Sequence, residues 1–279
     1  MSTRPLERNG LPWQNANYDY ENANYWNMTM SALSADGVLS SYSTVGSNIF
    51  LTAPGGLDRG IPGHTTTTMT CDWYKKAYPN IVVDCAVLDA FNIQYEYTPF
   101  MNGTSAAAPN ASGAIALLMS AANEQNHELT AREIRHLLAQ TATKIDAEHS
   151  DIIVNDLVGL EGWSQNAAGV NFSPFYGFGL VDVDKAVELI RRYAIENLPS
   201  ALVKTSWYGL EREDLTLTIL DNATTTSSTV TVADDLIIEA VQIRLDVDHS
   251  RMADLKVELE SPNGTRSILM SPYNHITIW

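Results

Sequence analysis

The sequence predicts an α/β domain with a parallel sheet, followed by a smaller all-β sandwich. Two short apolar runs, 28–33 and 47–53, have the length and content of mostly buried strands in a parallel sheet. Helical patterns follow them along the chain. Beyond about Leu198, apolar and polar residues alternate instead, as in strands that bury one face. We therefore expect two domains, 1–198 and 199–279.

The amino-acid composition and net charge argue against some classes of function. The chain has 279 residues, of which 45% are hydrophobic, enough for a core. Its net charge of −16 argues against nucleic acid as a partner, because phosphate binding needs a basic surface. No apolar run reaches the roughly 18 residues that cross a bilayer, so no membrane span is expected. The polar first ten residues lack the apolar stretch of a signal peptide, and both ends look cut.

The first half of the chain is expected to hold much irregular structure. The first 27 residues are rich in Asn, Tyr and Trp and predict a loop packed on a larger body. The Asp36–Gly37 pair between the two strands signals a turn. Residues 54–100 form a long irregular stretch, and a loop of this length in a compact domain is usually functional or inserted.

Three helices are expected after this stretch. Residues 104–122 are small and apolar nearly all round, which predicts a buried helix, and Pro109 is tolerated in its first turns. Thr130 is the expected N-cap of a second helix, with Glu133 as its capping-box partner. A third helix, 182–197, follows a Gly-rich approach and has basic residues in its later turns.

The all-β part is predicted from alternation alone. Turn signals such as the SPNG run separate its alternating segments, and no helical pattern fits them. The expected strands are 215–220, 228–232, 236–247 and 254–262.

The strongest candidate for a catalytic segment is NGTSAAAP, residues 102–109. Gly103 permits a tight turn there, and Ser105 stands at the start of the expected helix. A helix N-terminus offers free N–H groups that stabilise a developing oxyanion. A serine after Gly-Thr is also a common helix N-cap, so the tripeptide alone leaves both readings open.

The extended motif resembles the nucleophile segment of the subtilisin-like serine proteases. Residues 129–146 and 176–187 also resemble that family's next helix and the approach to its final helix. Residues 243–270 are similar to the P domain, the β-sandwich after the catalytic domain of kexin- and furin-like convertases and bacterial relatives. The resemblance covers most of residues 20–279. It implies the C-terminal part of a parallel-sheet catalytic domain followed by a partial P domain.

The family implies hydrolysis of polypeptide substrates through an acyl-enzyme on Ser105. Its triad runs Asp, His, Ser in chain order, so we expect the acid and the base upstream of Met1. The only histidine before the serine is His64, which lacks the family's H-G-T context and is expected to be an ordinary loop residue. Without a base the serine is a poor nucleophile, so the chain alone is expected to be nearly inert.

Two further site residues are suggested by the family. An Asn side chain serves there as an oxyanion donor. Asn9 is the candidate within this chain, and a donor outside the chain is the favoured alternative. An acidic residue shortly after that Asn helps to hold a basic P1 side chain. Asp19 is the candidate for this role, with a solvated loop acid as the alternative.

The cysteines and the metal are expectations of the same kind. By themselves, Cys71 and Cys85 could be bridged or free, and their spacing matches no zinc site. The secreted, extracellular setting of the family favours a disulfide between them. Calcium is expected as a structural ion, but no ligand is named. The acids Asp246, Asp248 and Asp254 lack the spacing of a calcium loop.

Two rival functions accompany this interpretation. The chain could be a non-catalytic interaction fragment that keeps the fold, or a complete hydrolase of another class that uses His64 as its base. Upstream coding sequence for D-[ST]-G and H-G-T motifs would favour the protease fragment.

Overall fold

The computed structural model describes residue 11 and residues 15–61, 63–82, 97–192, 202–209, 217–220 and 224–273. The chain forms two compact units. The first consists of residues 1–195 together with 246–279, and the second of residues 196–245.

The centre of the first unit is a pair of parallel strands, as the sequence predicts. Strand β1 (Thr29–Leu33) pairs with β2 (Ile49–Pro54). All but the last residue of β2 are buried, which explains why its sequence is continuously apolar rather than alternating. The approach to the last helix continues this arrangement, since Leu180 forms a parallel bridge with Thr52.

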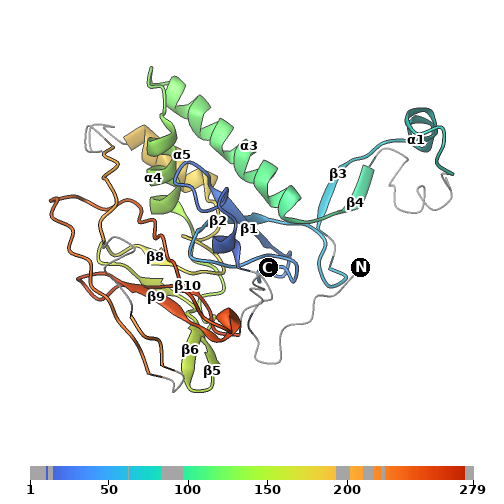
Figure 1. Ribbon diagram of the computed structural model, residues 1–279. Helices are drawn as coiled ribbons and strands as arrows, with labels where there is room; N and C mark the ends of the chain where they lie inside the picture. Colours follow the sequence, from blue (N-terminus) through green and yellow to red (C-terminus); the bar gives the residue numbers. More distant parts are fainter. Residues whose placement is uncertain are drawn as a thin grey trace. The chain divides into compact units, whose positions relative to one another are not determined.

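Three helices pack near these strands, and all three were expected (Figure 1). They are α3 (Thr104–Asn123), α4 (Ala131–Thr141) and α5 (Val183–Arg192). The predicted capping box of α4 is present in both directions between Thr130 and Glu133. The helices bury a common core with β2, whose members include Phe50, Leu118, Leu137, Leu138 and Ile190.

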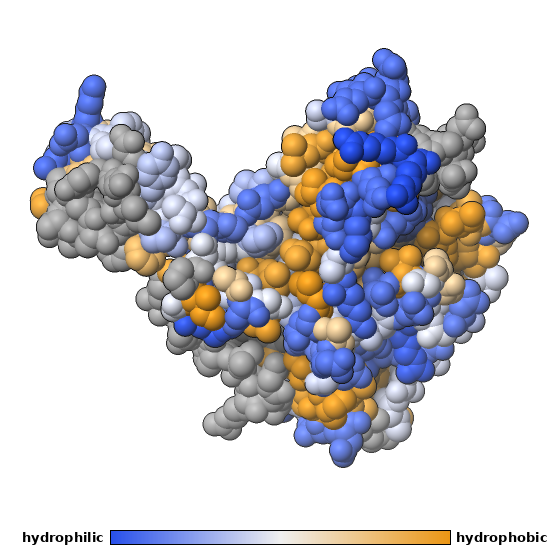
Figure 2. Space-filling view, turned by 180° about the vertical axis from the view of Figure 1, so that it is seen from behind, coloured by the Kyte–Doolittle hydropathy of each residue, from blue (hydrophilic) through white to orange (hydrophobic). Residues whose placement is uncertain are grey.

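Helix α3 is only partly buried, which corrects the prediction from its composition. Leu118 is fully buried, whereas its neighbour Leu117 is 58% exposed and Met119 is 41% exposed. Hydrophobic side chains also come to the surface among hydrophilic ones in the view from behind (Figure 2). One face of the helix packs on the strands and α5, and the opposite face lies open in this chain.

The stretch 54–100 is more ordered than its sequence suggests. It contains β3 (His64–Thr67) and α1 (Cys71–Ala77), and β4 (Tyr97–Met101) closes it. Strands β3 and β4 pair antiparallel, and the arm that they form extends away from the helices and the central strands (Figure 1). Its base is fixed to the body, because the Leu57 N–H donates to the Met101 carbonyl at 3.0 Å. The prediction of a wholly irregular loop was wrong.

Short antiparallel pairs complete the first unit. A second core includes residues from their strands together with Leu11 and Tyr176. The remaining short elements of the unit are η1 (Ala16–Tyr18), β5 (Ile152–Val154), β6 (Leu157–Leu160), β7 (Ser164–Gln165), β8 (Asn171–Phe172), η3 (Met252–Asp254), β9 (Val257–Glu260) and β10 (Arg266–Met270).

In the predicted all-β region, the residues that the structure describes form strands only from Val257 onward. Strand β9 confirms the prediction for 254–262, and β10 follows it in an antiparallel hairpin. The described residues of the predicted strands 215–220, 228–232 and 236–247 are in neither helix nor strand. Most of their apolar side chains are exposed, Ile237 at 83%. Alternation signals a face suited to burial, but a strand forms only when a neighbour pairs with it.

Candidate active site

Ser105 lies at the start of α3 with its side chain exposed. Gly103 is the N-cap residue, with φ of 108°. A β-carbon on it would approach no atom more closely than 3.5 Å. Backbone conformation rather than crowding therefore requires the glycine. The turn that it allows brings Ser105 to the solvent-facing tip of the helix.

The backbone around Ser105 offers hydrogen-bond donors to a ligand. The Ala106 and Ala107 N–H groups donate to the Gly103 carbonyl, at 2.9 and 3.3 Å. The N–H groups of Thr104 and Ser105 have no acceptor among the described residues. Free N–H groups at a helix N-terminus, beside an exposed hydroxyl, are what an acyl-transfer site needs for its oxyanion.

His64 is engaged away from Ser105. Its Nε2 lies 2.9 Å from the Pro54 carbonyl, to which it donates, and 3.1 Å from the Asn110 amide nitrogen. Asn110 also donates to the same carbonyl, at 3.1 Å. This histidine therefore helps to hold the base of the arm, which is the ordinary role that the sequence favours.

Two of the other described histidines form local contacts. His127 binds Glu133 at 3.1 Å, and His149 binds Asp146 at 2.9 Å. Within the described part of the chain, the Ser105 hydroxyl has no hydrogen-bond partner. These residues therefore supply Ser105 with neither a base nor an acid.

The two substrate-side candidates stay predictions. Asn9 lies outside the described residues, although Leu11, two positions on, is buried in the second core. Asp19 is exposed, and its carboxylate accepts bonds from the Glu21 N–H and the Asn22 amide, both at 2.9 Å. These contacts shape a local turn and do not bring Asp19 to Ser105.

The described residues include only part of the predicted disulfide and of the region in which a metal site was considered. Cys71 is buried at the start of α1 and is not a free thiol. Cys85 lies outside the described residues, so the pairing of Cys71 with Cys85 stays a prediction. No three His, Cys, Asp or Glu side chains gather as metal ligands in the part of the chain that is described. There Asp254 pairs with Arg251 at 2.8 Å instead.

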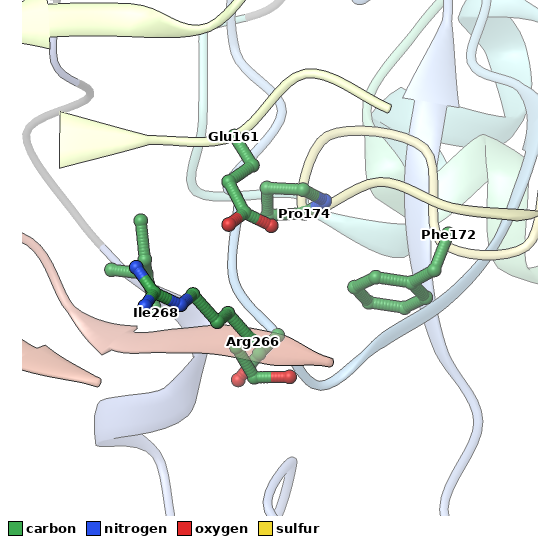
Figure 3. A pocket seen from close by; sticks show the side chains of 7 residues that line it. Glu161, Phe172, Pro174, Arg266 and Ile268 are labelled. Carbon is green, nitrogen blue, oxygen red and sulfur yellow. The ribbon is translucent and has the colours of Figure 1, made fainter. Parts of the chain in front are cut away.

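A small pocket is lined by residues of β10 and by residues of the first unit that precede it along the chain. It has about 10 Å³ of space, room for one water, and Glu161 and Arg266 face it from opposite sides (Figure 3). Burial raises the pKa of Glu161, and the carboxylates of Asp151 and Glu258 raise it further. The pocket is too small for a substrate, so we assign it to packing.

The sequence motifs and the geometry of α3 agree with what comparison with known proteins finds. Residues 9–179 match the subtilase family, and residues 238–277 match the proprotein convertase P-domain. The chain belongs to the subtilase family. Its described helices have no segment long and apolar enough to cross a membrane.

Several relatives show how far the likeness extends. The Aeromonas extracellular serine protease of Aeromonas sobria is 45% identical over 95% of this chain and 44% of its own length. Proprotein convertase subtilisin/kexin type 6 of Rattus norvegicus is 32% identical over 61% of this chain and 16% of its own length. A crystal structure of the Aeromonas sobria protease with a chaperone has a TM-score of 0.76 at 42% identity, covering 95% and 45% of the two chains. The chain thus spans less than half the length of these relatives.

Two contacts of the residues before β1 have no signal in the sequence. Asn17 bonds to a carbonyl 252 positions away, in β10. The Arg135 guanidinium lies 4.7 Å from the centre of the Tyr25 ring and 4.2 Å from that of Phe50. Asn17 belongs to no motif, and Arg135 lies in the family-like stretch 129–146, which carries no signal for this contact. A pattern search cannot find contacts that only the folded chain creates.

Proposed function

We propose that this chain is the C-terminal part of a longer serine endopeptidase in which Ser105 is the nucleophile. The observation that carries the proposal is the exposed Ser105 at the N-terminus of α3, within the NGTSAAAP segment and after a glycine at φ of 108°. The substrate is a polypeptide, and the setting is extracellular, as the name of the Aeromonas sobria relative suggests for that protein.

The chemistry follows from the position of the hydroxyl. The Ser105 Oγ attacks the scissile carbonyl carbon and forms a C–O bond, while its proton passes to a base. The carbonyl π electrons move onto the oxygen, which the free N–H groups at the start of α3 stabilise. When the C–N bond breaks, the amine leaves with that proton. A water molecule then attacks the ester carbonyl carbon and gives a proton to the base; the Ser105 C–O bond breaks, the carboxylic acid product keeps the water oxygen, and Ser105 takes the proton from the base.

The base is proposed to lie outside this chain. The Ser105 hydroxyl has no partner among the described residues, and His64 is committed to the Pro54 carbonyl. The exposed apolar face of α3, with Leu117 at 58%, is where we expect the upstream half of the catalytic domain to pack. By itself the chain is proposed to be nearly inert as a peptidase.

Calcium stays a proposal for the whole protein only. No described cluster of acids offers a ligand set, so we assign calcium no step in the reaction.

The test is Ser105→Ala in the longer protein, with kcat for a peptide substrate as the measurement. We expect kcat to fall by about six orders of magnitude, because a triad acts as a unit. Ser112→Ala is the matched control. It removes an exposed hydroxyl from the same helix, one that only donates to the Ala108 carbonyl at 3.0 Å. Full activity after Ser105→Ala would refute the proposed function.

A further inference from the structure

The segment 15–27 follows Asn9 and carries Asp19, the two residues that the family resemblance suggests for the substrate side of the site and that stay predictions here. It begins with η1, whose first turn is capped when the Asn15 side chain accepts from the Asn17 N–H at 2.9 Å. Residues 18–21 are exposed. A mostly exposed segment keeps one shape only if its ends are held.

Asn17 holds the first end with its whole amide group. Its Nδ2 donates to the Ser47 hydroxyl and to the Leu269 carbonyl, both at 2.9 Å. Its Oδ1 accepts from the Asn48 N–H at 3.1 Å. One half-buried side chain thus joins η1, the entry to β2, and β10. The position needs two donor hydrogens and an acceptor, which a carboxylate cannot provide.

The surroundings of Asn17 leave it little freedom. A β-carbon on Gly46 would lie 2.6 Å from the Asn15 Oδ1 and 2.9 Å from the Oδ1 atoms of Asn17 and Asn48. Asn48 in turn donates from its Nδ2 to the Ala16 carbonyl at 3.0 Å. The side-chain amides of Asn15, Asn17 and Asn48 therefore pack tightly against Gly46, where no larger residue would fit. Asn17 cannot rotate without displacing these neighbours.

The acceptor on β10 is equally well fixed. Ile268 and Met270, on either side of Leu269, are buried at 5% and 6% exposure. Ile268 belongs to the same core as Leu11. Burial of these side chains therefore sets the position of the Leu269 carbonyl. That carbonyl lies within the P-domain match, whereas Asn17 lies within the subtilase match.

Arg135 holds the far end of the segment. Its Nη1 donates to the Asn27 carbonyl at 3.0 Å, and its guanidinium lies over the Tyr25 ring. Arg135 comes from α4, inside the catalytic part. The two ends thus depend on different parts of the chain, and only the Asn17 end depends on the P domain.

We infer that Asn17 is a positioning residue that makes the geometry of the 15–27 segment, and so substrate binding, depend on the docking of strand β10. The inference rests on the proposed function. It differs from a general stabilising role because it acts on one segment of the substrate side.

The test is Asn17→Asp in the longer protease. This isosteric change keeps the acceptor for the Asn48 N–H but removes the donor hydrogens to both the Ser47 hydroxyl and the Leu269 carbonyl. The Ser47 hydroxyl can donate to the new carboxylate, so the bond to Leu269 is the one that is lost. We expect KM for a peptide substrate to rise about tenfold, the effect of losing one partly buried hydrogen bond, while kcat changes less than about twofold. Backbone amides of residues 18–23 should exchange hydrogen faster.

Asn24→Asp is the matched control. It makes the same charge change in the same segment, and it keeps the exposed acceptor that Asn24 offers to the Trp26 N–H at 3.0 Å. We expect its KM and exchange rates to be unchanged. Equal KM values for Asn17→Asp and Asn24→Asp, or a lowered melting temperature with unchanged KM, would overturn the inference.

A milder variant covers a failure of Asn17→Asp to fold. Ser47→Ala removes one of the two acceptors of Asn17, and we expect KM to rise about two- to threefold. An unchanged KM in Ser47→Ala would then overturn the inference. If Ser105→Ala loses activity but Asn17→Asp keeps a normal KM, only this inference is refuted. If Ser105→Ala stays active, the proposed function itself is refuted.

Discussion

Glu161 shows how a single residue makes the stability of the first unit depend on pH. Burial raises its pKa above the ordinary 4.5, and Asp151 and Glu258 add to the rise, while Lys256 and Arg266 oppose it. The folded state therefore favours the protonated carboxyl. As pH rises from the ordinary value through the raised one, the charged form appears in the folded chain and stability falls.

Glu161→Gln should consequently raise the melting temperature of this chain at pH 7 and have no effect near pH 3, where the carboxyl is protonated in both states. The measurement is thermal unfolding followed across this pH range. Glu148→Gln, an exposed acid with the same charge change, is the control and should leave the melting temperature unaltered. An equal rise for both variants would mean that net charge, rather than the site of Glu161, is responsible.

At the level of elements, helix α3 has one buried face and one exposed face. Leu118 is fully buried, so Leu118→Ala should lower the free energy of unfolding of this chain by about 2–5 kcal/mol. Leu117, 58% exposed, is its matched control, and Leu117→Ala should cost less than about 0.5 kcal/mol here. In the longer protein Leu117→Ala should become costly, because the upstream half is proposed to cover that face. A small cost of Leu117→Ala in both proteins would contradict that packing.

The elements also show how far sequence reasoning reaches. The α4 capping box between Thr130 and Glu133 and the short strand β2 were predicted correctly, because each is encoded by neighbouring residues. The strands expected at 228–232 and 236–247 are absent from the described chain, because pairing depends on distant neighbours. Ser105 could be proposed as the nucleophile from the sequence because its motif is contiguous. Asn17 was missed because its partners become neighbours only on folding.

For the whole molecule, the central claim is that Ser105 is a serine protease nucleophile whose base lies outside this chain. It accounts for three observations. The serine is exposed at a helix N-terminus, its hydroxyl has no described partner, and the chain spans 44% of its Aeromonas sobria relative.

Labelling with a fluorophosphonate, followed by mass spectrometry of the modified peptide, tests this claim most directly. The reagent reacts with a serine that a base has activated. The account predicts rapid labelling of the longer protein at Ser105 and no labelling of this chain under the same conditions. Rapid labelling of Ser105 in this chain alone, or labelling of the longer protein at another residue, would contradict it.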